Sequence, residues 1–221
     1  MNSPYTIIIP IFNEAEAIPD LLQDLKLFKA QGHEILIVND GSDDDSHQIL
    51  SRCKFISLIH LKKNFGKGIA IRNGIEKALN EKLILFDGDR ELNTKEIHNL
   101  MVLDEKKKVR LVFANRIMLH TYTNFMWIIG NKILTSIFNI IHKSNLKDAL
   151  CCAKAFYKSD LNINSLKADK FDIDVEIACN LVKKHNSYNT IPLEYCRRNR
   201  RQGKKLRLRD SLSILLKILK C

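Results

Sequence analysis

The chain has 221 residues, of which 45% are hydrophobic and 28% are charged, proportions typical of a folded soluble protein. A chain of this length can bury one core, so we expect a single domain with at most a small appendage. Its 36 Lys and Arg residues against 25 Asp and Glu give a net charge of +11, which predicts an anionic partner: nucleic acid, an acidic membrane surface or phosphorylated small molecules. Eight of the basic residues lie in one stretch, 197–209.

The six cysteines form no C-x-x-C pair and do not cluster with histidines, so we expect neither a zinc site nor a disulfide framework. Reduced thiols of a cytosolic protein fit this usage better. The N-terminus lacks a charged segment followed by an apolar one, so no signal peptide is expected. No run of about 18 apolar residues predicts a transmembrane helix.

The first half of the chain alternates between apolar runs and amphipathic stretches. Continuous apolar runs rich in β-branched residues predict buried strands, at 5–11, 33–40, 55–61 and 82–87. Apolar residues at helical spacing, or good N-cap residues before an apolar stretch, predict helices between them, within 14–30, 42–53 and 66–79. This order predicts an α/β fold with a mostly parallel sheet covered by helices.

The second half is less regular. We expect strands at 109–116, 149–158 and 189–198, helical structure over 117–143 and 173–184, and a short amphipathic helix at 208–220. In that last helix four leucines share one face beside lysines: Leu208, Leu212, Leu215 and Leu219. Such a stripe is typical of a helix at a membrane interface, although packing on the core is the commoner use of it.

The stretch "LILFDGDRELN", 83–93, ends a buried strand with two carboxylates, Asp87 and Asp89. Ligands of parallel sheets bind at the carboxyl ends of the strands, where Asp40 also lies. Two acids this close repel each other, and a divalent cation such as Mg²⁺ or Mn²⁺ removes that cost. The alternative is a turn with two solvated acids, which the D-x-D pattern by itself does not exclude.

The segment "NFGKG" precedes a predicted helix. It offers flexible backbone, the Lys67 ammonium and a positive helix N-terminus to a phosphate group. The alternative is that Lys67 is an ordinary surface lysine. For Asp43 to Asp45 we favour helix capping over ligand binding.

Eight segments together resemble the inverting family 2 glycosyltransferases with a GT-A fold. In chain order they are "TIIIPIFNEAEAI", "ILIVNDGSDDD", "NFGKGIAIRNGI", "LILFDGDRELNTKEI", "VFANR", "GNKILTSIFNII", "LKD" and "RRQGKKL". Within that family the chain resembles the dolichol-phosphate mannose synthase group and bacterial polyprenyl-phosphate sugar transferases. The resemblance runs from about residue 5 to 210 and implies one GT-A domain over 1–207. Its halves would be nucleotide-sugar-binding (1–115) and acceptor-binding (116–207), followed by the amphipathic helix 208–221.

The resemblance implies roles for the residues that match the family's motifs. The nucleotide of a UDP- or GDP-linked sugar would be held by Pro10, Asn13, Glu14, Asp40, Lys67, Gly68 and Gly88. Asp87 and Asp89 would bind Mg²⁺ or Mn²⁺ on the diphosphate, with Glu91, in place of the family's usual Gln, as a third ligand. The acceptor phosphate would be held by Arg116, Lys132, Arg200 and Lys204. The residues expected in the reaction itself are Asp148, Arg116 and Arg200.

Several positions depart from the family's pattern. Asn39-Asp40 replaces the usual pair of acids, Cys152 and Lys154 replace a Gly and an Arg, and the late basic motif lacks its serine. These departures leave the acceptor open. A lipid phosphate is already an anion and needs no base, whereas a hydroxyl acceptor would need one, for which Asp148 is the candidate. Asp148 as a structural acid in a loop is the plainer alternative.

The function that the resemblance implies is sugar transfer to a polyprenyl phosphate by a peripheral protein at the inner face of the cytoplasmic membrane. Transfer to a glycan or lipid hydroxyl in cell-envelope polysaccharide synthesis is the alternative. A nucleic-acid-binding protein is a third reading of the +11 charge, but no recognition helix or aromatic-rich binding sheet is visible, so no nucleic-acid partner is expected. A catalytically silent scaffold is a fourth, and the intact Asp40, Asp87 and Asp89 argue against it.

Overall fold

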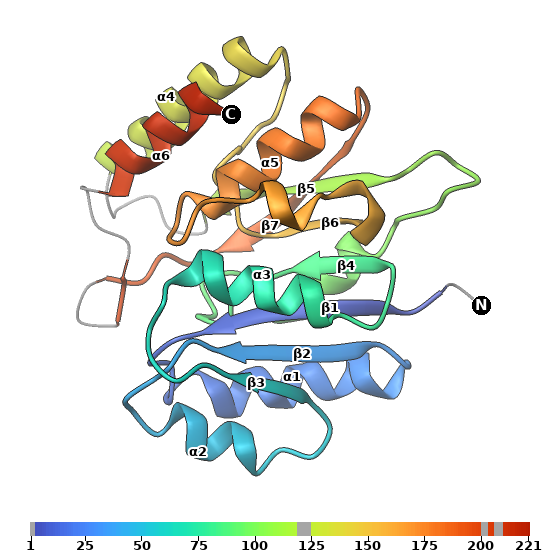
Figure 1. The fold of residues 1–221 in the computed structure, drawn as a ribbon, viewed down its shortest axis with the longest axis vertical. Helices are drawn as coiled ribbons and strands as arrows, with labels where there is room; N and C mark the ends of the chain where they lie inside the picture. The colour runs from blue at the N-terminus through green and yellow to red at the C-terminus, as the bar shows by residue number, and fades with distance from the viewer. Residues whose placement is uncertain (1–2, 119–124, 200–202, 206–209) are drawn as a thin grey trace.

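A seven-stranded sheet forms the centre of the computed structural model, which describes residues 3–118, 125–199, 203–205 and 210–221 (Figure 1). The strands are β1 (Tyr5–Ile11), β2 (Glu34–Asn39), β3 (Ser57–His60), β4 (Lys82–Leu85), β5 (Leu111–Met118), β6 (Lys154–Tyr157) and β7 (Asn189–Tyr195). Their order in the sheet is β3-β2-β1-β4-β6-β5-β7. Only β6 runs antiparallel to its neighbours, β4 and β5, among these strands. The predicted α/β fold with a mostly parallel sheet is confirmed.

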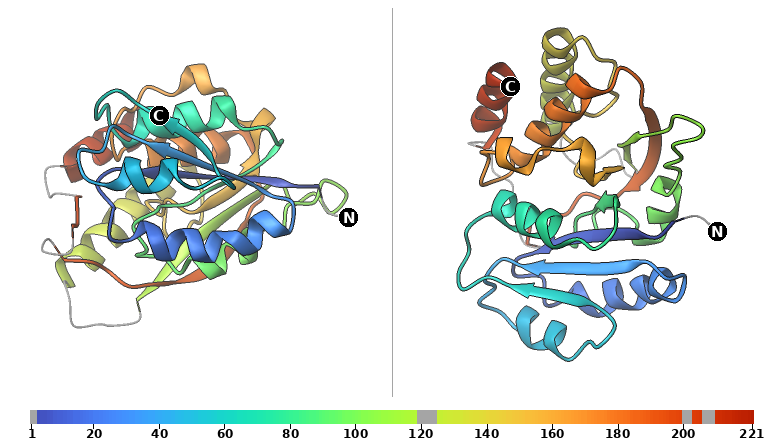
Figure 2. Two further views of the ribbon diagram at one scale, coloured as in Figure 1. Left: turned by 90° about the horizontal axis from the view of Figure 1, so that it is seen from below. Right: turned by 45° about the vertical axis from the view of Figure 1, so that its right-hand side comes forward.

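Helices cover both faces of this sheet. They are α1 (Ile18–Ala30), α2 (Ser46–Ser51), α3 (Lys67–Lys77), α4 (Phe125–His142), α5 (Ile173–Lys184) and α6 (Asp210–Lys220), with 3₁₀ helices η1 (Thr94–Leu100), η2 (Lys158–Asp160) and η3 (Ile163–Ser165). In the left view of Figure 2, α1 and α3 lie on opposite sides of the strands. Each face therefore has its own apolar core.

Strand β1 shows why the chain folds this way. Its side chains alternate between the two faces, as the pleat of a strand requires. Ile7 and Ile9 belong to the core under α1, whereas Ile8 belongs to the core under α3 and α5. All three are fully buried, so β1 must read as a continuous apolar run rather than an alternating one.

The expected elements differ from the observed ones mainly at their ends. The strand expected at 149–158 is confined to β6, because Lys154 turns the preceding residues into a loop by donating to the carbonyls of Cys151 and Cys152. The helical structure expected from 117 begins at 125, since β5 continues along β7 as far as the pair Met118 and Tyr195. Residues 119–124 lie outside the described part of the chain.

Helices α4 and α6 lie side by side at the upper end of the molecule in Figure 1. His142 of α4 contacts the carbonyl oxygen of Ile218 in α6 at 3.1 Å through its Nε2 atom. Ile214 and Ile218 face the core, whereas Leu212, Leu216 and Leu219 are exposed. Within the described residues, no helix combines the length and the apolar character needed to cross a membrane.

A pair of glycine substitutions tests the packing of α3 on the sheet. A Cβ atom at Gly74 would lie 2.4 Å from Cγ2 of the buried Ile8, whereas one at Gly130 in α4 would meet nothing within 4 Å. We expect Gly74→Ala to lower the free energy of unfolding by about 1–3 kcal/mol because the β-branched Ile8 cannot move aside. Gly130→Ala should raise it by about 0.5–1 kcal/mol, the helix-propensity gain alone. Urea unfolding measures the free energy of unfolding of both variants. Equal changes in the two variants would contradict the close packing of α3 on Ile8.

Candidate active site

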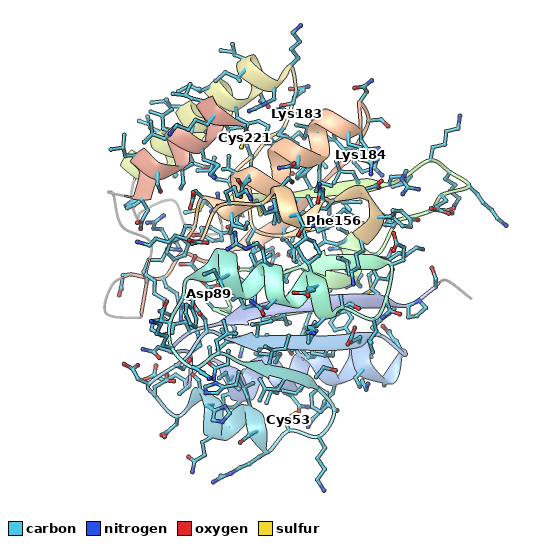
Figure 3. The ribbon with its side chains drawn as sticks, viewed as in Figure 1. Cys53, Asp89, Phe156, Lys183, Lys184 and Cys221 are labelled. Atoms are coloured by element: carbon cyan, nitrogen blue, oxygen red, sulfur yellow. The ribbon has the colours of Figure 1, made fainter. Side chains whose placement is uncertain are left out.

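One cavity of about 840 Å³ opens at the edge where β1, β2 and β4 have their carboxyl ends. Figure 3 places Asp89 at this edge, beside the ends of the arrows of β1 and β2 in Figure 1. The cavity brings together most of the residues predicted from the sequence: Pro10, Glu14, Asp40, Lys67, Asp87, Gly88, Asp89, Glu91, Arg116, Lys132, Asp148 and Lys204. Asn13 and Gly68 do not line it, and Arg200 lies outside the described residues.

Asp87 is not a free turn carboxylate. The Nζ atom of Lys67 lies 2.7 Å from its Oδ1 and 2.9 Å from its Oδ2. Burial opposes the ionisation of Asp87, but the Lys67 ammonium outweighs it and lowers the pKa of this carboxyl. Lys67 also contacts Asp174 of α5 at 2.8 Å, so it bridges two carboxylates rather than pointing into solvent.

Asp89 has the opposite electrostatic situation. Burial and the neighbouring carboxylates of Glu91 and Asp87 raise its pKa to about 6. Its nearest described cation is the Nη2 atom of Arg198, at 3.6 Å, which is too far for a hydrogen bond. A divalent cation shared with Asp87 would supply the missing positive charge, so these two side chains fit Mg²⁺ or Mn²⁺.

Glu91, the predicted third metal ligand, has other partners. It accepts hydrogen bonds from the Tyr195 hydroxyl and from the Arg198 backbone N–H, both at 2.8 Å, and it pairs with the Lys204 ammonium. Among the described residues, no three His, Cys, Asp or Glu side chains are grouped to hold a metal ion. The geometry therefore favours Asp87 and Asp89 as a pair, with Glu91 anchoring the segment after β7. Three donors already occupy most of the roughly four acceptor sites of the Glu91 carboxylate, so it is less available to a cation than Asp89.

The predicted nucleotide residues divide into two groups. Asp40 is buried, and its two carboxylate oxygens accept the backbone N–H groups of Phe65 and Gly66, both at 2.8 Å. Burial raises the pKa of Asp40 despite these two hydrogen bonds. Asp40 therefore fixes the loop before α3 against the end of β2, where both flank the cavity.

Asn13 and Glu14 are engaged within the protein. The Asn13 side chain exchanges hydrogen bonds with Asp43, at 2.5 and 3.0 Å. Glu14 forms a bidentate pair with Arg198, at 2.7 and 2.9 Å, and it also pairs with Lys205. Asp43 thus holds the loop after β1. Of the predicted capping residues Asp43 to Asp45, it is Asp44 whose carboxylate accepts the backbone N–H of Ser46, the first residue of α2, at 2.9 Å, whereas the N-cap Asp45 makes no side-chain capping bond.

Arg116 and Asp148 lie at the centre of the part of the cavity that the sequence predicts for the acceptor. Arg116 donates through Nε and Nη2 to the two oxygens of Asp148, at 2.6 and 2.9 Å, and Asn131 supports both partners. Burial opposes the ionisation of Asp148, but Arg116 and the hydrogen bonds outweigh it and lower the pKa of Asp148. A carboxylate with a lowered pKa and both oxygens engaged is a weak base, so this geometry favours a role in positioning Arg116.

Three residues with a place in this site carried no assignment from the sequence. Arg198 forms an ion pair with Glu14, and Asp174 forms one with Lys67. The Tyr195 hydroxyl donates a hydrogen bond to Glu91. The sequence showed the basic stretch that contains Arg198 as a run of charge. It did not show which of these side chains faces the cavity. Asp174 gave no signal, because its partner Lys67 lies 107 residues away in the chain.

The fold and the cavity together define a class of protein. A mostly parallel α/β sheet whose carboxyl edge carries two aspartates, several half-buried cations and one large cavity suits an enzyme that binds a nucleotide. The family model of glycosyl transferase family 2 matches residues 6–163, and the chain belongs to this family. The recognition of the family and of its GT-A fold is thereby confirmed.

Curated relatives extend the similarity. An undecaprenyl-phosphate 4-deoxy-4-formamido-L-arabinose transferase of Pseudomonas savastanoi is 36% identical over 110 residues, which cover 46% of this chain and 32% of the relative. The glycosyltransferase AglJ of Haloferax volcanii is 25% identical over 203 residues, which cover 86% of this chain and 62% of AglJ. The chain thus spans about a third of the length of the first of these relatives and less than two thirds of the second.

Solved structures share the fold at low sequence identity. Mannosyl-3-phosphoglycerate synthase from Rubrobacter xylanophilus aligns with a TM-score of 0.76 and 14% identity, over 98% of this chain and 72% of that one. Glucosyl-3-phosphoglycerate synthase from Mycobacterium tuberculosis, solved with Mn²⁺, UDP and phosphoglyceric acid, aligns with a TM-score of 0.71 and 14% identity, over 98% and 76%.

The raised pKa of Asp89 predicts a pH dependence of donor binding. Below about pH 6 Asp89 is protonated and cannot ligate a cation, and above it the carboxylate is available. The affinity for UDP-glucose with Mn²⁺ should therefore rise with pH up to about 6, by up to about tenfold per pH unit, and then level off. Isothermal titration measures this, and UDP-glucose has no phosphate that titrates in the range. Asp89→Asn should bind weakly with no such step; an equal step in that variant would refute the assignment.

Proposed function

We propose that the chain transfers a sugar from a UDP-linked donor to the phosphate of a polyprenyl lipid, with a divalent cation at Asp87 and Asp89. The observation that carries this proposal is the position of Arg116. Its guanidinium lies in the same cavity as the two aspartates, and it is held there by the ionised Asp148. The site can therefore bring a diphosphate and a second phosphate together.

The donor assignment is supported by both chemistry and similarity. A cation bound by Asp87 and Asp89 would act as a Lewis acid and stabilise the charge that develops on the leaving diphosphate. The Mycobacterium tuberculosis neighbour was solved with Mn²⁺ and UDP, which supports a uridine nucleotide and a divalent metal. The cation is Mg²⁺ or Mn²⁺, and GDP-linked sugars are the alternative donor.

The acceptor assignment is based on the Arg116 contacts. Nε and Nη2 of Arg116 bind Asp148, which leaves Nη1 without a partner among the described residues. A phosphate oxygen attacks as an anion and needs no base, so the low pKa of Asp148 is no obstacle. For a glycan hydroxyl the same low pKa would be a disadvantage. Lys132 and Lys147 add positive charge to this part of the cavity.

The lipid part of such an acceptor would need an apolar surface next to the cations. The acceptor half of the cavity is lined by Trp127, Ile128 and Leu134, and by Ile214 of α6. The Pseudomonas savastanoi relative is named for an undecaprenyl-phosphate substrate, which supports the same acceptor class. This combination of phosphate-binding cations and apolar side chains favours a lipid phosphate over a small soluble phosphate.

Membrane association at the inner face of the cytoplasmic membrane is the localisation that this acceptor requires. Of the stripe predicted in the last helix, Leu212 and Leu219 are exposed at 63% and 57%, Leu215 is half-buried, and Leu208 lies outside the described residues. Ile133 and Ile140 of the adjacent α4 are also exposed. We propose that this outer surface of α4 and α6 contacts lipid.

The basic stretch gives little support to a nucleic-acid-binding function. Arg198, Lys204 and Lys205 pair with Glu14 and Glu91 inside the protein. Cations that are neutralised internally do not release counterions from a phosphate backbone, so they would add nothing to duplex binding.

The direct test is transfer from a panel of UDP-sugars to a short-chain polyprenyl phosphate in detergent, with Mn²⁺ or Mg²⁺. We expect product with one donor, and a loss of at least about 100-fold in both Asp87→Ala and Arg116→Ala, because each removes charge stabilisation from one substrate. Arg116→Ala should keep Mn²⁺-dependent UDP binding, whereas Asp87→Ala should lose it. Lys95→Ala, outside the cavity, is the control. Transfer to glycan hydroxyls but not to lipid phosphate would overturn the acceptor assignment.

Membrane contact is tested by flotation with vesicles that contain anionic lipid. The triple change Leu212→Ser, Leu216→Ser and Leu219→Ser should lower vesicle binding by about tenfold or more, since each exposed leucine loses apolar burial. The matched control changes two leucines that are also exposed but lie elsewhere, Leu27→Ser and Leu79→Ser. Equal losses in both proteins would show that the surface of α4 and α6 has no special role.

A further inference from the structure

Lys67 occupies an unusual position for a lysine. It is the first residue of α3, where the helix dipole disfavours a positive charge, and its side chain is only 11% exposed. It remains charged because two carboxylates hold it: Asp87 at 2.7 Å and Asp174 at 2.8 Å. Burial opposes this charge, but Asp174 and Asp87 outweigh it and raise the pKa of Lys67 well above its usual value.

The packing of α3 fixes Lys67 in this place. The Gly68 backbone N–H donates to the Asp169 carbonyl oxygen at 2.8 Å, and a Cβ atom at Gly68 would lie 2.1 Å from the Ala168 carbonyl oxygen. Arg72 donates to the same carbonyl of Ala168 at 3.2 Å. The start of α3 is thus bound to the segment just before α5, and the Lys67 backbone cannot follow a movement of Asp87.

Asp174 is the better-supported of the two carboxylates. It lies in the first turn of α5, where the helix dipole favours a negative charge. On its other side is the fully buried Lys154, whose Nζ lies 3.8 Å from Oδ1 of Asp174. Lys154 is fixed in turn by the carbonyls of Cys151 and Cys152, at 2.7 and 3.1 Å.

Asp87 and Asp174 therefore differ in how much compensating positive charge each would lose if the Lys67 side chain moved away. Asp174 is compensated by two ammonium groups, whereas Lys67 is the only cation within 4 Å of Asp87 among the described residues. The two oxygens of Asp87 that contact Lys67 are the atoms that a divalent cation would need. A cation and the Lys67 ammonium cannot both hold them at full strength, because like charges this close repel.

We infer that Lys67 is a built-in competitor for the divalent cation at Asp87, and that Asp174 is the positioning residue that retains this ammonium when the cation displaces it. The inference rests on the proposed use of Asp87 as a metal ligand. The inference goes beyond the proposed function because it predicts that the protein without nucleotide binds the divalent cation weakly. The nucleotide diphosphate is an anion that can pair with the Lys67 ammonium, so its binding promotes binding of the cation.

The test is the affinity of the full chain for Mn²⁺ alone, measured by electron paramagnetic resonance of the free ion, without nucleotide. Lys67→Met should bind Mn²⁺ at least about tenfold more tightly than the wild type, because Asp87 is released. Asp174→Asn should bind it more weakly, because Lys67 then has only Asp87. The double variant should match Lys67→Met, since Asp174 acts only through Lys67, and Asp174→Glu should restore wild-type affinity.

Lys204→Met is the matched control, because it removes a nearby cation that contacts Glu91 and not Asp87. An equal gain in Lys204→Met would mean that Lys67 acts by general repulsion, which overturns the inference. So would unchanged Mn²⁺ affinity in Lys67→Met, or a loss in the double variant relative to Lys67→Met. If the buried Asp174 variants do not fold, the comparison of Lys67→Met with Lys204→Met still decides the competition.

The results that would contradict the proposed function differ from those that would contradict this inference. If Lys67→Met binds Mn²⁺ tightly but the wild type with Mn²⁺ binds no nucleotide sugar, the donor assignment is wrong while the competition stands. If Mn²⁺ and UDP-glucose bind but no lipid phosphate is glycosylated, only the acceptor is wrong. Where UDP-glucose binds the wild type, it should tighten Mn²⁺ binding at least about tenfold, and equal Mn²⁺ affinities with and without the bound UDP-glucose would contradict the inference.

Discussion

The carboxyl edge of the parallel sheet collects negative charge in a small, largely buried volume, and the rest of the site is arranged around that constraint. Asp40 follows β2, and Asp87 and Asp89 follow β4, with β1 between these two strands. Glu14 lies in the loop after β1, and Glu91 lies in the same loop as Asp89. Buried carboxylates are stable only with hydrogen-bond donors or cations. Asp40 has backbone donors, Asp87 has Lys67, and Glu14 has Arg198, whereas the nearest described cation to Asp89 is the Arg198 guanidinium, 3.6 Å away. That deficit is the feature of the edge that fits the proposed metal ion.

The cations that compensate this negative charge come from distant parts of the chain. Lys67 begins α3, Arg116 lies in β5, and Arg198 follows β7. The family model ends at residue 163, yet the segment after it provides Asp174, Tyr195 and Arg198 to the cavity. The cavity is therefore completed by a part of the chain that lies beyond the family match.

The two halves of the cavity use ion pairs in different ways. In the proposed donor half, Lys67 is shared between Asp87 and Asp174, so one carboxylate can be released while the other keeps the charge. In the proposed acceptor half, Arg116 is bound by both oxygens of Asp148 and supported by Asn131, which fixes the plane of the guanidinium. A shared lysine suits a site that exchanges cations, whereas a bidentate arginine suits a site that orients a phosphate.

The sequence by itself determined the alternation of strands and helices, the α/β class, the GT-A family and the position of the two aspartates after β4. These follow from local patterns: apolar runs, helical spacing and a short acidic motif. It did not reveal the loop before β6, in which Lys154 donates to the nearby carbonyls of Cys151 and Cys152. Nor did it show that 117 and 118 belong to a strand, because the pairing of β5 with β7 is a contact between remote residues. For the same reason only the tertiary structure decided the partners of the charged groups. The sequence offered Glu91 as a metal ligand, Asp148 as a base and Lys67 as a phosphate ligand. The fold surrounds Glu91 with hydrogen-bond donors, pairs Asp148 with Arg116 and places Lys67 between two carboxylates. The sequence gives the charge of each side chain, but tertiary packing decides which other charges lie next to it.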